Sequence, residues 1–453
     1  MLLLAGAFVH SAPTQAQQKT GPGVPADQSL TWHGITLYGV VDLGVQYDTH
    51  SAPFTPYRPA ASGNIVRQNS RESIVGLTPS NMGQSRVGLQ GIEALNDEWS
   101  AVFQVEAFFN PESGEVPDSL KSLAVNNGLP LSRQSVAVDG SSAGQAFQTS
   151  FVGLKSARFG TLTFGRQATL WYEGIVRYDP NYAASAFGLL GASNTYSGAG
   201  SQETNRLDST AKYVLGVGER VRLGTLYKFN GSGGSANTAF QANVGTRFGG
   251  ASLDAYYSKV QSAITATSLT STQVAQLPAL GLSASNSLAA TISDNTAYAL
   301  MASYQLDSLR FFAGYDYIKY ENPRTPLSAG FIDIGGYVLA FVNDAAYDNA
   351  KISQVYWTGI RYAVVPKLEL AVAYYGVHQS AYGNGAQAGC STAAYSVCSG
   401  SLEAFSFDAD YRFNVHFDAY IGAMYSGVHD GLANGYPVYT TNVNPTIGVR
   451  YKF

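Results

Sequence analysis

The chain has 453 residues and a mass of 48.1 kDa, and 45% of its residues are hydrophobic. Charged residues make up only 13%, about half of the usual share, whereas 48 glycines, 30 tyrosines and 22 phenylalanines favour turns and aromatic-rich strands. The net charge of -4 and the lack of a run of Lys or Arg exclude a basic surface for nucleic acid.

The N-terminal stretch MLLLAGAFVHSAPTQAQQ has the composition of a secretory signal peptide. An apolar run from Leu2 to Val9 is followed by small and polar residues, with a suitable cleavage site after Ala16. We therefore expect residues 1–16 to be a signal peptide and residues 17–32 to be an N-terminal segment; a disordered N-terminus is the alternative. No later apolar stretch in the sequence approaches the ~18 residues that a membrane helix requires, so any membrane crossing must use strands.

Alternation of apolar and polar residues predicts β-strands along the chain. In ITLYGVVDLGVQYD one face carries Ile35, Leu37, Val41, Leu43, Val45 and Tyr47, opposite Thr36, Tyr38, Asp42 and Gln46. The stretches AVFQVEAFF and VRLGTLYKF divide in the same way, into one apolar face and one polar face. Such strands also suit a half-buried soluble sheet, so alternation alone does not establish a membrane protein.

The spacing of the strands is more specific. We predict about 16 strands, near residues 34–48, 84–94, 98–110, 146–157, 160–167, 206–217, 220–229, 238–248, 250–260, 294–305, 308–320, 351–365, 367–379, 402–413, 416–429 and 444–453. Short turns such as LND and ARFG alternate with long linkers at 49–83, 111–145, 168–205, 230–237, 261–293, 321–350, 380–401 and 430–443. An even number of strands, with short turns at one rim and long loops at the other, is typical of an outer-membrane barrel.

The C-terminal stretch NPTIGVRYKF supports closure of such a barrel. In hydrocarbon every backbone N–H and C=O group needs a partner, so only a closed sheet can span a membrane as strands. The stretch alternates up to its last residue, Phe453, which we expect in an aromatic girdle at the membrane interface. Residues 33–453 are therefore predicted to form an all-β, transmembrane antiparallel β-barrel whose last strand pairs with its first.

Cys390 and Cys398 are the two cysteines of the chain, and both lie in the polar segment GNGAQAGCSTAAYSVCSG. An exported chain meets an oxidising compartment, and a metal site would need more ligands nearby. We therefore expect a disulfide within this loop, and two inert thiols are the alternative.

With these features the sequence resembles the trimeric general porins of Gram-negative outer membranes. The resemblance rests on TLYGVVDLGVQY, SRVGLQGIEALNDEWSAVFQVEAFFNPESG, FVGLKSARFGTLTFGRQ, RLDSTAKY and the terminal GVRYKF, in family order. It implies a sixteen-stranded homotrimeric barrel in the lipid of the cell outer membrane, with a third extracellular loop, residues 168–205, folded inward to narrow the pore. It also implies a water-filled channel for passive diffusion of ions and small hydrophilic solutes, without a cofactor.

The same resemblance places candidate residues at the pore constriction, where family members face acidic loop residues with basic wall residues. The candidates are Arg86, Arg206 and Lys212 on the wall and Glu173 and Asp179 on the loop. For each charge, a solvated position without a special role is the alternative. By alternation the wet lumen also carries Arg222, Lys228, Arg361 and Arg450 against Asp42, Glu106, Asp208 and Glu369, which is nearly balanced. The wall arginines favour a weak anion preference.

Three other functions remain open at this point. A substrate-selective outer-membrane channel would differ from a general one only in its solute sites. An outer-membrane barrel enzyme is disfavoured because the sequence has six His but neither a G-x-S-x-G nor an H-E-x-x-H motif. A secreted soluble β-sandwich binding protein would need its aromatic residues in a core rather than at strand ends. We therefore predict a channel, not an enzyme, and no nucleic-acid partner.

Overall fold

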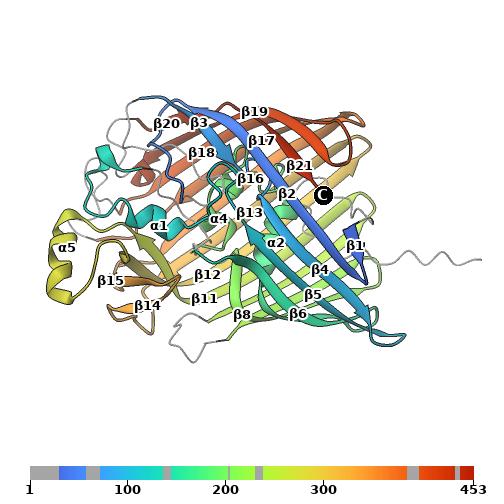
Figure 1. Ribbon diagram of the computed structural model, residues 1–453, viewed down its shortest axis with the longest axis horizontal. Coiled ribbons are helices and arrows are strands. Elements are labelled where there is room, and N and C mark those ends of the chain that lie inside the picture. Colours follow the sequence, from blue (N-terminus) through green and yellow to red (C-terminus); the bar gives the residue numbers. More distant parts are fainter. Residues whose placement is uncertain are drawn as a thin grey trace, which may run out of the picture.

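A computed structural model describes residues 30–57, 72–135, 144–201, 205–229, 238–384, 397–433 and 439–453. Within these residues the chain forms a closed antiparallel β-barrel of 16 strands (Figure 1). The barrel strands are β2 (Ile35–Asp48), β4 (Arg86–Ala94), β5 (Trp99–Phe108), β6 (Phe147–Ser156), β7 (Gly160–Ala168), β8 (Arg206–Val217), β9 (Val221–Lys228), β10 (Ala239–Phe248), β11 (Ala251–Thr267), β12 (Ser287–Leu306), β13 (Leu309–Glu321), β16 (Lys351–Val365), β17 (Leu368–Gln379), β18 (Gly400–Arg412), β19 (Phe417–Asp430) and β21 (Thr446–Lys452). Each strand predicted from alternation corresponds to one of these strands, so the predicted fold class is confirmed. The predicted signal peptide, residues 1–16, lies outside the described residues.

The first and last barrel strands close the sheet as predicted. One edge of β2 pairs with β4. The other edge pairs with β21 in the register Val40↔Lys452 to Gln46↔Thr446. The seam extends to the final residue, because the Gly39 N–H donates to Phe453 O at 2.9 Å and the Phe453 N–H donates to Gly39 O at 3.1 Å. The chain therefore ends where its last hydrogen bonds close the barrel.

Gly39 leaves the space that the Phe453 ring occupies at this seam. A Cβ at residue 39 would lie 2.3 Å from Cζ of Phe453 and 2.8 Å from the Arg86 carbonyl oxygen. We expect Gly39→Ala to displace the ring and to lower the free energy of unfolding by about 1–3 kcal/mol. Thermal unfolding followed by circular dichroism measures the effect. The control is Gly216→Ala, whose added Cβ would find its nearest atom at 3.9 Å; equal unfolding temperatures for the two variants would contradict the prediction.

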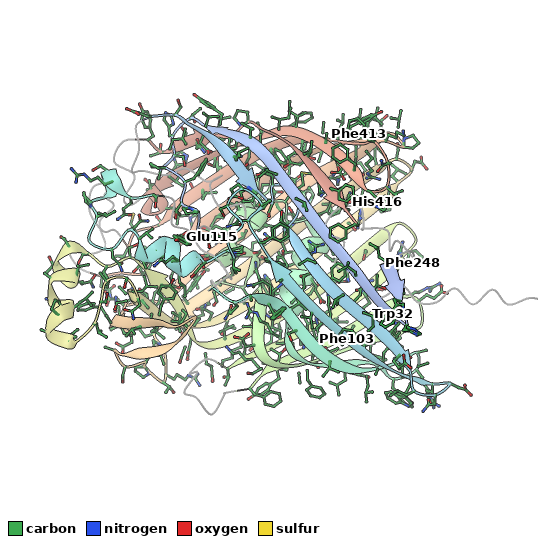
Figure 2. The ribbon with its side chains drawn as sticks, in the orientation of Figure 1. Trp32, Phe103, Glu115, Phe248, Phe413 and His416 are labelled. Atoms are coloured by element: carbon green, nitrogen blue, oxygen red, sulfur yellow. The ribbon has the colours of Figure 1, made fainter. Side chains whose placement is uncertain are left out.

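Side chains alternate between the two faces of the barrel as predicted. Val41, Val45 and Leu223 are exposed on the outer face, whereas Asp42 and Glu106 are buried on the inner face. On the outer face, ring contacts with centroid separations of 4.7–6.5 Å form an aromatic belt that comprises Phe240, Tyr257, Tyr298, Tyr317, Tyr356, Tyr374, Phe405 and Tyr425. Figure 2 shows Trp32, Phe248, Phe413 and His416 at the end of the barrel opposite α1 and α5. Aromatic side chains of this kind mark membrane–water interfaces.

The long-loop end of the barrel contains more structure than we predicted. It carries β3 (Ile74–Pro79), α1 (Ser119–Ala124), α5 (Ser271–Gln276), β14 (Phe331–Ile334), β15 (Tyr337–Asn343) and β20 (Thr441–Val443) (Figure 1). The predicted loops 261–293 and 321–350 are therefore wrong in part, because β11 and β12 extend into the first and a hairpin forms in the second. The described helices are too short and too polar to cross a membrane.

Apolar packing explains these extra elements. Leu120 and Leu123 of α1 pack against Ile264 of β11, Leu288 of β12 and Leu339 of β15 in one buried cluster. The strand β15 also pairs in parallel with β12. Cys398 lies between β17 and β18, where its carbonyl oxygen accepts from Gln379 Nε2 at 3.2 Å, and it is buried. Cys390 lies outside the described residues, so their disulfide stays a prediction.

The second strand of the barrel is interrupted at residues 80–85. Both β3 and β4 pair with β2, and the residues between them leave the sheet. The carboxylate of Asp42 accepts hydrogen bonds from the backbone N–H groups of Met82 at 2.7 Å and Gly83 at 2.9 Å. This bend at residues 80–85 spans the end of the predicted loop 49–83, where we also failed to predict β3, and the first two residues of the predicted strand 84–94. It supplies a contact point inside the barrel.

Candidate functional site

Residues 169–201 follow β7 and make up most of the connection to β8. They contain α2 (Leu170–Tyr178), α3 (Leu189–Ala192) and α4 (Asn194–Ser197). The helix α2 begins where the Thr169 hydroxyl accepts a hydrogen bond from the Tyr172 N–H at 3.2 Å. Such a cap satisfies one of the free N–H groups of the first helical turn. We call residues 169–201 the bore segment, because their contacts are with inward-facing side chains of the barrel wall.

One side of the bore segment is held by a hydrophobic core. Trp171, Ile175, Tyr178, Leu189 and Leu190 pack against wall side chains from β12 to β19, which are Met301, Ile318, Val355, Trp357, Val377, Leu402, Ala404, Met424 and Val428. The indole N–H of Trp357 also donates to the Tyr178 carbonyl oxygen at 2.9 Å. These strands therefore present an apolar patch that the bore segment covers, beside the charged side chains that some of the same strands also carry.

The tip of the bore segment reaches the bend at residues 80–85. The Ser185 hydroxyl donates to the Ser80 carbonyl oxygen at 2.8 Å, and the Ala186 N–H donates to the Asn81 carbonyl oxygen at 3.0 Å. Phe187 packs there with Tyr420 of β19. The bore segment is thus attached to strands on both sides of the barrel seam as well as to β12–β19.

Arg86 and Arg206, the predicted wall residues, meet around an acidic residue of the wall itself. Arg86 Nε lies 3.1 Å from Glu106 Oε2, and Arg206 Nη2 lies 4.0 Å from Glu106 Oε1. The Arg206 guanidinium also stacks between two rings, 4.6 Å from the centroid of Phe108 and 5.5 Å from that of Tyr172. Only 7% and 5% of the two arginine side chains are exposed. These residues are more enclosed than the wet lumen charges that the sequence led us to expect.

Lys212 and Glu173 form the kind of pair that we predicted, with a base on the wall and an acid on the bore segment. Lys212 Nζ lies 2.7 Å from Glu173 Oε1, and it also donates to the Ala168 carbonyl oxygen at 3.0 Å. Both side chains are partly exposed. The pair fixes the first turn of α2 against β8.

Asp179 has a different environment from the one expected at the constriction. Its carboxylate accepts from the Tyr375 hydroxyl at 2.7 Å and from the Ala183 N–H at 2.7 Å, and it does not contact Arg86 or Arg206. The neighbouring Pro180 carbonyl oxygen accepts from Arg361 Nη1 at 2.8 Å. Asp179 therefore holds the turn after α2 against β16 and β17, and its role in selectivity stays a prediction.

The buried position of Asp179, which lies outside the membrane-spanning strands, gives the bore segment a pH dependence. Burial raises the pKa of Asp179 from 3.8 to about 6, although the Tyr375 hydroxyl and two backbone N–H groups favour the charged form. The folded state therefore binds this proton more tightly than the unfolded state. Its stability decreases as the pH rises from about 4 to about 6 and is not regained above that.

We expect Asp179→Asn to remove this loss, because the amide stays neutral and still accepts the Ala183 N–H. The variant should match the wild type near pH 4 and exceed its free energy of unfolding by on the order of 2 kcal/mol at pH 8. The difference between the two unfolding temperatures, measured at both pH values, checks this. A constant difference across that range would contradict the assignment.

Arg166 is a site residue that alternation does not predict. The register with β8 shifts between Gly165 and Gln167, so Arg166 occupies a β-bulge. It reaches Asp208 Oδ1 at 2.6 Å and Gln148 Oε1 at 3.2 Å. The signal in the sequence is Gly165, which has a φ of 134°, because glycine inside a strand often marks a bulge.

Charge is distributed unevenly around the inner wall among the described residues. On β4–β10, β11 and α2, the basic side chains Arg86, Lys155, Arg166, Arg177, Arg206, Lys212, Arg222, Lys228 and Arg247 outnumber the acidic side chains Glu106, Glu173, Asp208 and Asp254. On β2, β13–β21 and the turn after α2, the acidic residues Asp42, Asp48, Asp179, Asp316, Glu369, Asp408, Asp410 and Asp418 outnumber the basic residues Arg310, Lys351, Arg361, Arg412, Arg450 and Lys452. The inner wall from β4 to β11 is therefore the more positive half.

Comparisons with known proteins agree with this architecture. A family model described as Gram-negative porin matches residues 2–431. An outer membrane porin protein of Bordetella pertussis is 26% identical over 212 residues, which are 47% of this chain and 47% of that protein. The chain thus aligns with about half the length of this curated relative.

Solved structures show the same fold at low sequence identity. The anion-selective porin from Comamonas acidovorans superposes with a TM-score of 0.58 at 16% identity, covering 92% of this chain and 99% of that one. OmpT, an outer membrane protein of Vibrio cholerae, gives 0.57 at 15% identity, covering 92% and 97%. The closed 16-strand barrel and the family match over residues 2–431 lead to one assignment. The chain belongs to the Gram-negative porin family and is a protein of the outer membrane.

Proposed function

We propose that the chain is a channel for passive diffusion of ions and small hydrophilic solutes. The observation that carries the proposal is the lining of the barrel. Beside the apolar patch that the bore segment covers, the inner wall carries charged side chains, and among them Arg166, Asp208, Lys212 and Glu173 are partly exposed. We propose that the bore segment is the constriction loop, that the long loops face the cell exterior, and that passage involves no catalysis, nucleotide or cofactor.

A weak preference for anions follows from the charge on the inner wall from β4 to β11. The basic side chains there outnumber the acidic ones, so an anion that passes along this wall meets the more favourable potential. Glu106, Asp208, Glu173 and Asp254 each neutralise part of that charge, which keeps the preference weak. The structural relative from Comamonas acidovorans is described as an anion-selective porin.

Conductance of the purified protein in a planar bilayer tests the proposal. In a potassium chloride gradient without any added cofactor, we expect stable ohmic channels. Their zero-current potential should be displaced modestly toward the equilibrium potential of chloride. A protein that inserts but does not conduct would contradict the channel function. A zero-current potential displaced toward the equilibrium potential of potassium would contradict only the anion preference.

We also propose a homotrimer whose contact lies over the barrel seam. The aromatic belt runs from β10 to β19, but the exposed outward side chains on β21, β2, β3 and β4 are mostly aliphatic: Val449, Ile447, Val45, Val75, Leu77, Val87 and Leu89. Tyr47 of β2 and Tyr451 of β21 are the exposed aromatic residues of this aliphatic sector. A surface with so few interfacial aromatic side chains suits contact with protein rather than with lipid. A structural relative, OmpT of Vibrio cholerae, is described in a trimer form.

A bulky side chain in the aliphatic sector should weaken assembly. We expect Val45→Trp to lower the temperature at which the oligomer dissociates by at least 10 °C, because the new ring cannot fit a packed contact. Native electrophoresis after stepwise heating measures this. The control is Val244→Trp on β10, where an exposed valine faces outward beside the aromatic belt. Equal dissociation temperatures would place the contact elsewhere.

A further inference from the structure

A second basic cluster lies at the short-turn end of the bore, away from Arg86 and Arg206. Arg222 is the second residue of β9 and Ser252 is the second residue of β11, so both follow short turns. Arg177 and Tyr178 end α2 and reach the same place. With Asp254, these residues form what we call the inner cluster.

The contacts of the inner cluster join the bore segment to the wall. Arg177 Nη1 lies 3.0 Å from Asp254 Oδ2, and Arg222 Nη2 lies 2.6 Å from Asp254 Oδ1. Arg222 Nη2 also donates to the Tyr178 hydroxyl at 3.1 Å and to the Ser252 hydroxyl at 3.2 Å. Arg222 reaches Asp254 across β10 because the residue between them is Gly245, where a Cβ would lie 1.9 Å from Asp254 Oδ1.

The inner cluster contains more positive charge than its structural contacts require. The buried Asp254 carboxylate also accepts from the Tyr256 hydroxyl at 2.9 Å, so one arginine would already neutralise and satisfy it. Two arginines share it instead, and 28% of each side chain is exposed while Asp254 is 0% exposed. Arg177 Nη2 and Arg222 Nη1 have no hydrogen bond among the described residues. The surplus is one positive charge beside the half-buried Ser252 hydroxyl, whose oxygen lies 2.7 Å from the hydroxyl of the buried Tyr178.

We propose that Arg177 and Arg222, with the hydroxyl of Ser252, form a binding site for an oxyanion, such as the carboxylate or phosphate group of a passing solute. Guanidinium groups bind such groups through paired, charge-assisted hydrogen bonds. The inference rests on the proposed channel function and deepens it, because it assigns the class of solute that the inner end of the pore retains.

Along α2 this site is the last of three basic contacts with the wall. Tyr172 touches Arg206, Glu173 binds Lys212, and Arg177 lies beside Arg222. The first and last of these places have two arginines for each carboxylate, whereas the middle place is a balanced ion pair. Several weak sites in series allow a solute to enter without being trapped, which conduction requires.

Orthophosphate is the probe for this site. In a planar bilayer containing the wild-type oligomer in potassium chloride, we expect phosphate added on the short-turn side to reduce the chloride current in a saturable way. In the variant Arg177→Gln/Arg222→Gln, half-maximal block should require at least tenfold more phosphate. The matched control is Arg412→Gln. Arg412 is 31% exposed at the same end of the barrel, but it is paired with Glu369 on the opposite wall, and its removal should leave the block unchanged.

A second variant tests the same site by gain of binding. Asp254→Asn should free both guanidinium groups and make phosphate block more potent. This variant tests the site even if the double variant fails to assemble. Unchanged block in the double variant, or equal loss of block in the Arg412 control, would overturn the oxyanion site. Wild-type channels that conduct chloride without phosphate block would also overturn the site while leaving the channel function intact. The absence of any conductance would overturn both.

Discussion

Replacing Arg86 and Arg206 together with serine is expected to change the anion preference of the channel into a cation preference. The two arginines share Glu106, so their removal turns a local charge of one positive unit into one negative unit. Because only 7% and 5% of the two arginine side chains are exposed, water screens their charges weakly, and each charge should act on selectivity by at least on the order of 1 kcal/mol. The loss of Arg206 from between Phe108 and Tyr172 should also widen the path and raise the conductance.

The zero-current potential in a salt gradient measures this change, and its sign should reverse. The triple variant Arg86→Ser/Arg206→Ser/Glu106→Gln removes the remaining negative charge and is the control; its zero-current potential should return toward that of the wild type. The oligomer should still assemble, because the barrel strands keep their backbone pairing. An unchanged zero-current potential in the double variant would show that another part of the bore determines ion selectivity.

Trp171→Ala is expected to have the largest effect on the bore segment. Trp171 is fully buried where α2 packs against β11 and β12, with its ring 6.4 Å from that of Tyr256. Removing a buried tryptophan side chain costs about 3–5 kcal/mol, through lost burial and the cavity that remains. The bore segment should therefore detach from β11 and β12 part of the time, and the channel current should become noisier.

Single-channel recording and thermal unfolding measure these two consequences. The control is Trp32→Ala, which removes the same side chain from an exposed position at the short-turn rim (Figure 2). We expect the control to keep both the current noise and the unfolding temperature of the wild type. Quiet channels in the Trp171 variant would show that the hydrophobic core is not what holds the bore segment in place.

The barrel strands could be predicted because each of them obeys one physical constraint along its whole length. A strand between lipid and lumen must alternate, and Val41, Val45 and Leu223 appear on the outer face for that reason. No such constraint acts on the long loops. The hairpin of β14 and β15 is stabilised by contacts with α1 and β12, which lie far away in sequence. Strand β3 was missed because it lies inside the stretch 49–83, which we predicted as one long loop, and residues 80–85 separate it from β4.

The candidate site could be predicted only in part. The resemblance supplied Arg86, Arg206, Lys212 and Glu173, and the structure brings these four residues into two ion-paired groups. Which acid meets which base depends on strand register and on the path of the bore segment. We placed Glu106 in the lumen but did not predict that it pairs with Arg86 and Arg206. Arg166 reaches the site through a bulge that breaks alternation. Asp179 was predicted as a partner of wall bases, but it binds Tyr375 instead.

The apolar inner wall from β12 to β19 has a consequence for the use of this protein as a nanopore. Deletion of an inward loop is a simple way to widen a pore, but here the bore segment shields an apolar patch that includes Met301, Val355 and Trp357. Without that shield, the patch would face the lumen, and detergent or acyl chains would partition onto it. A wide aqueous pore built on this scaffold would need polar replacements on those strands before the segment is removed.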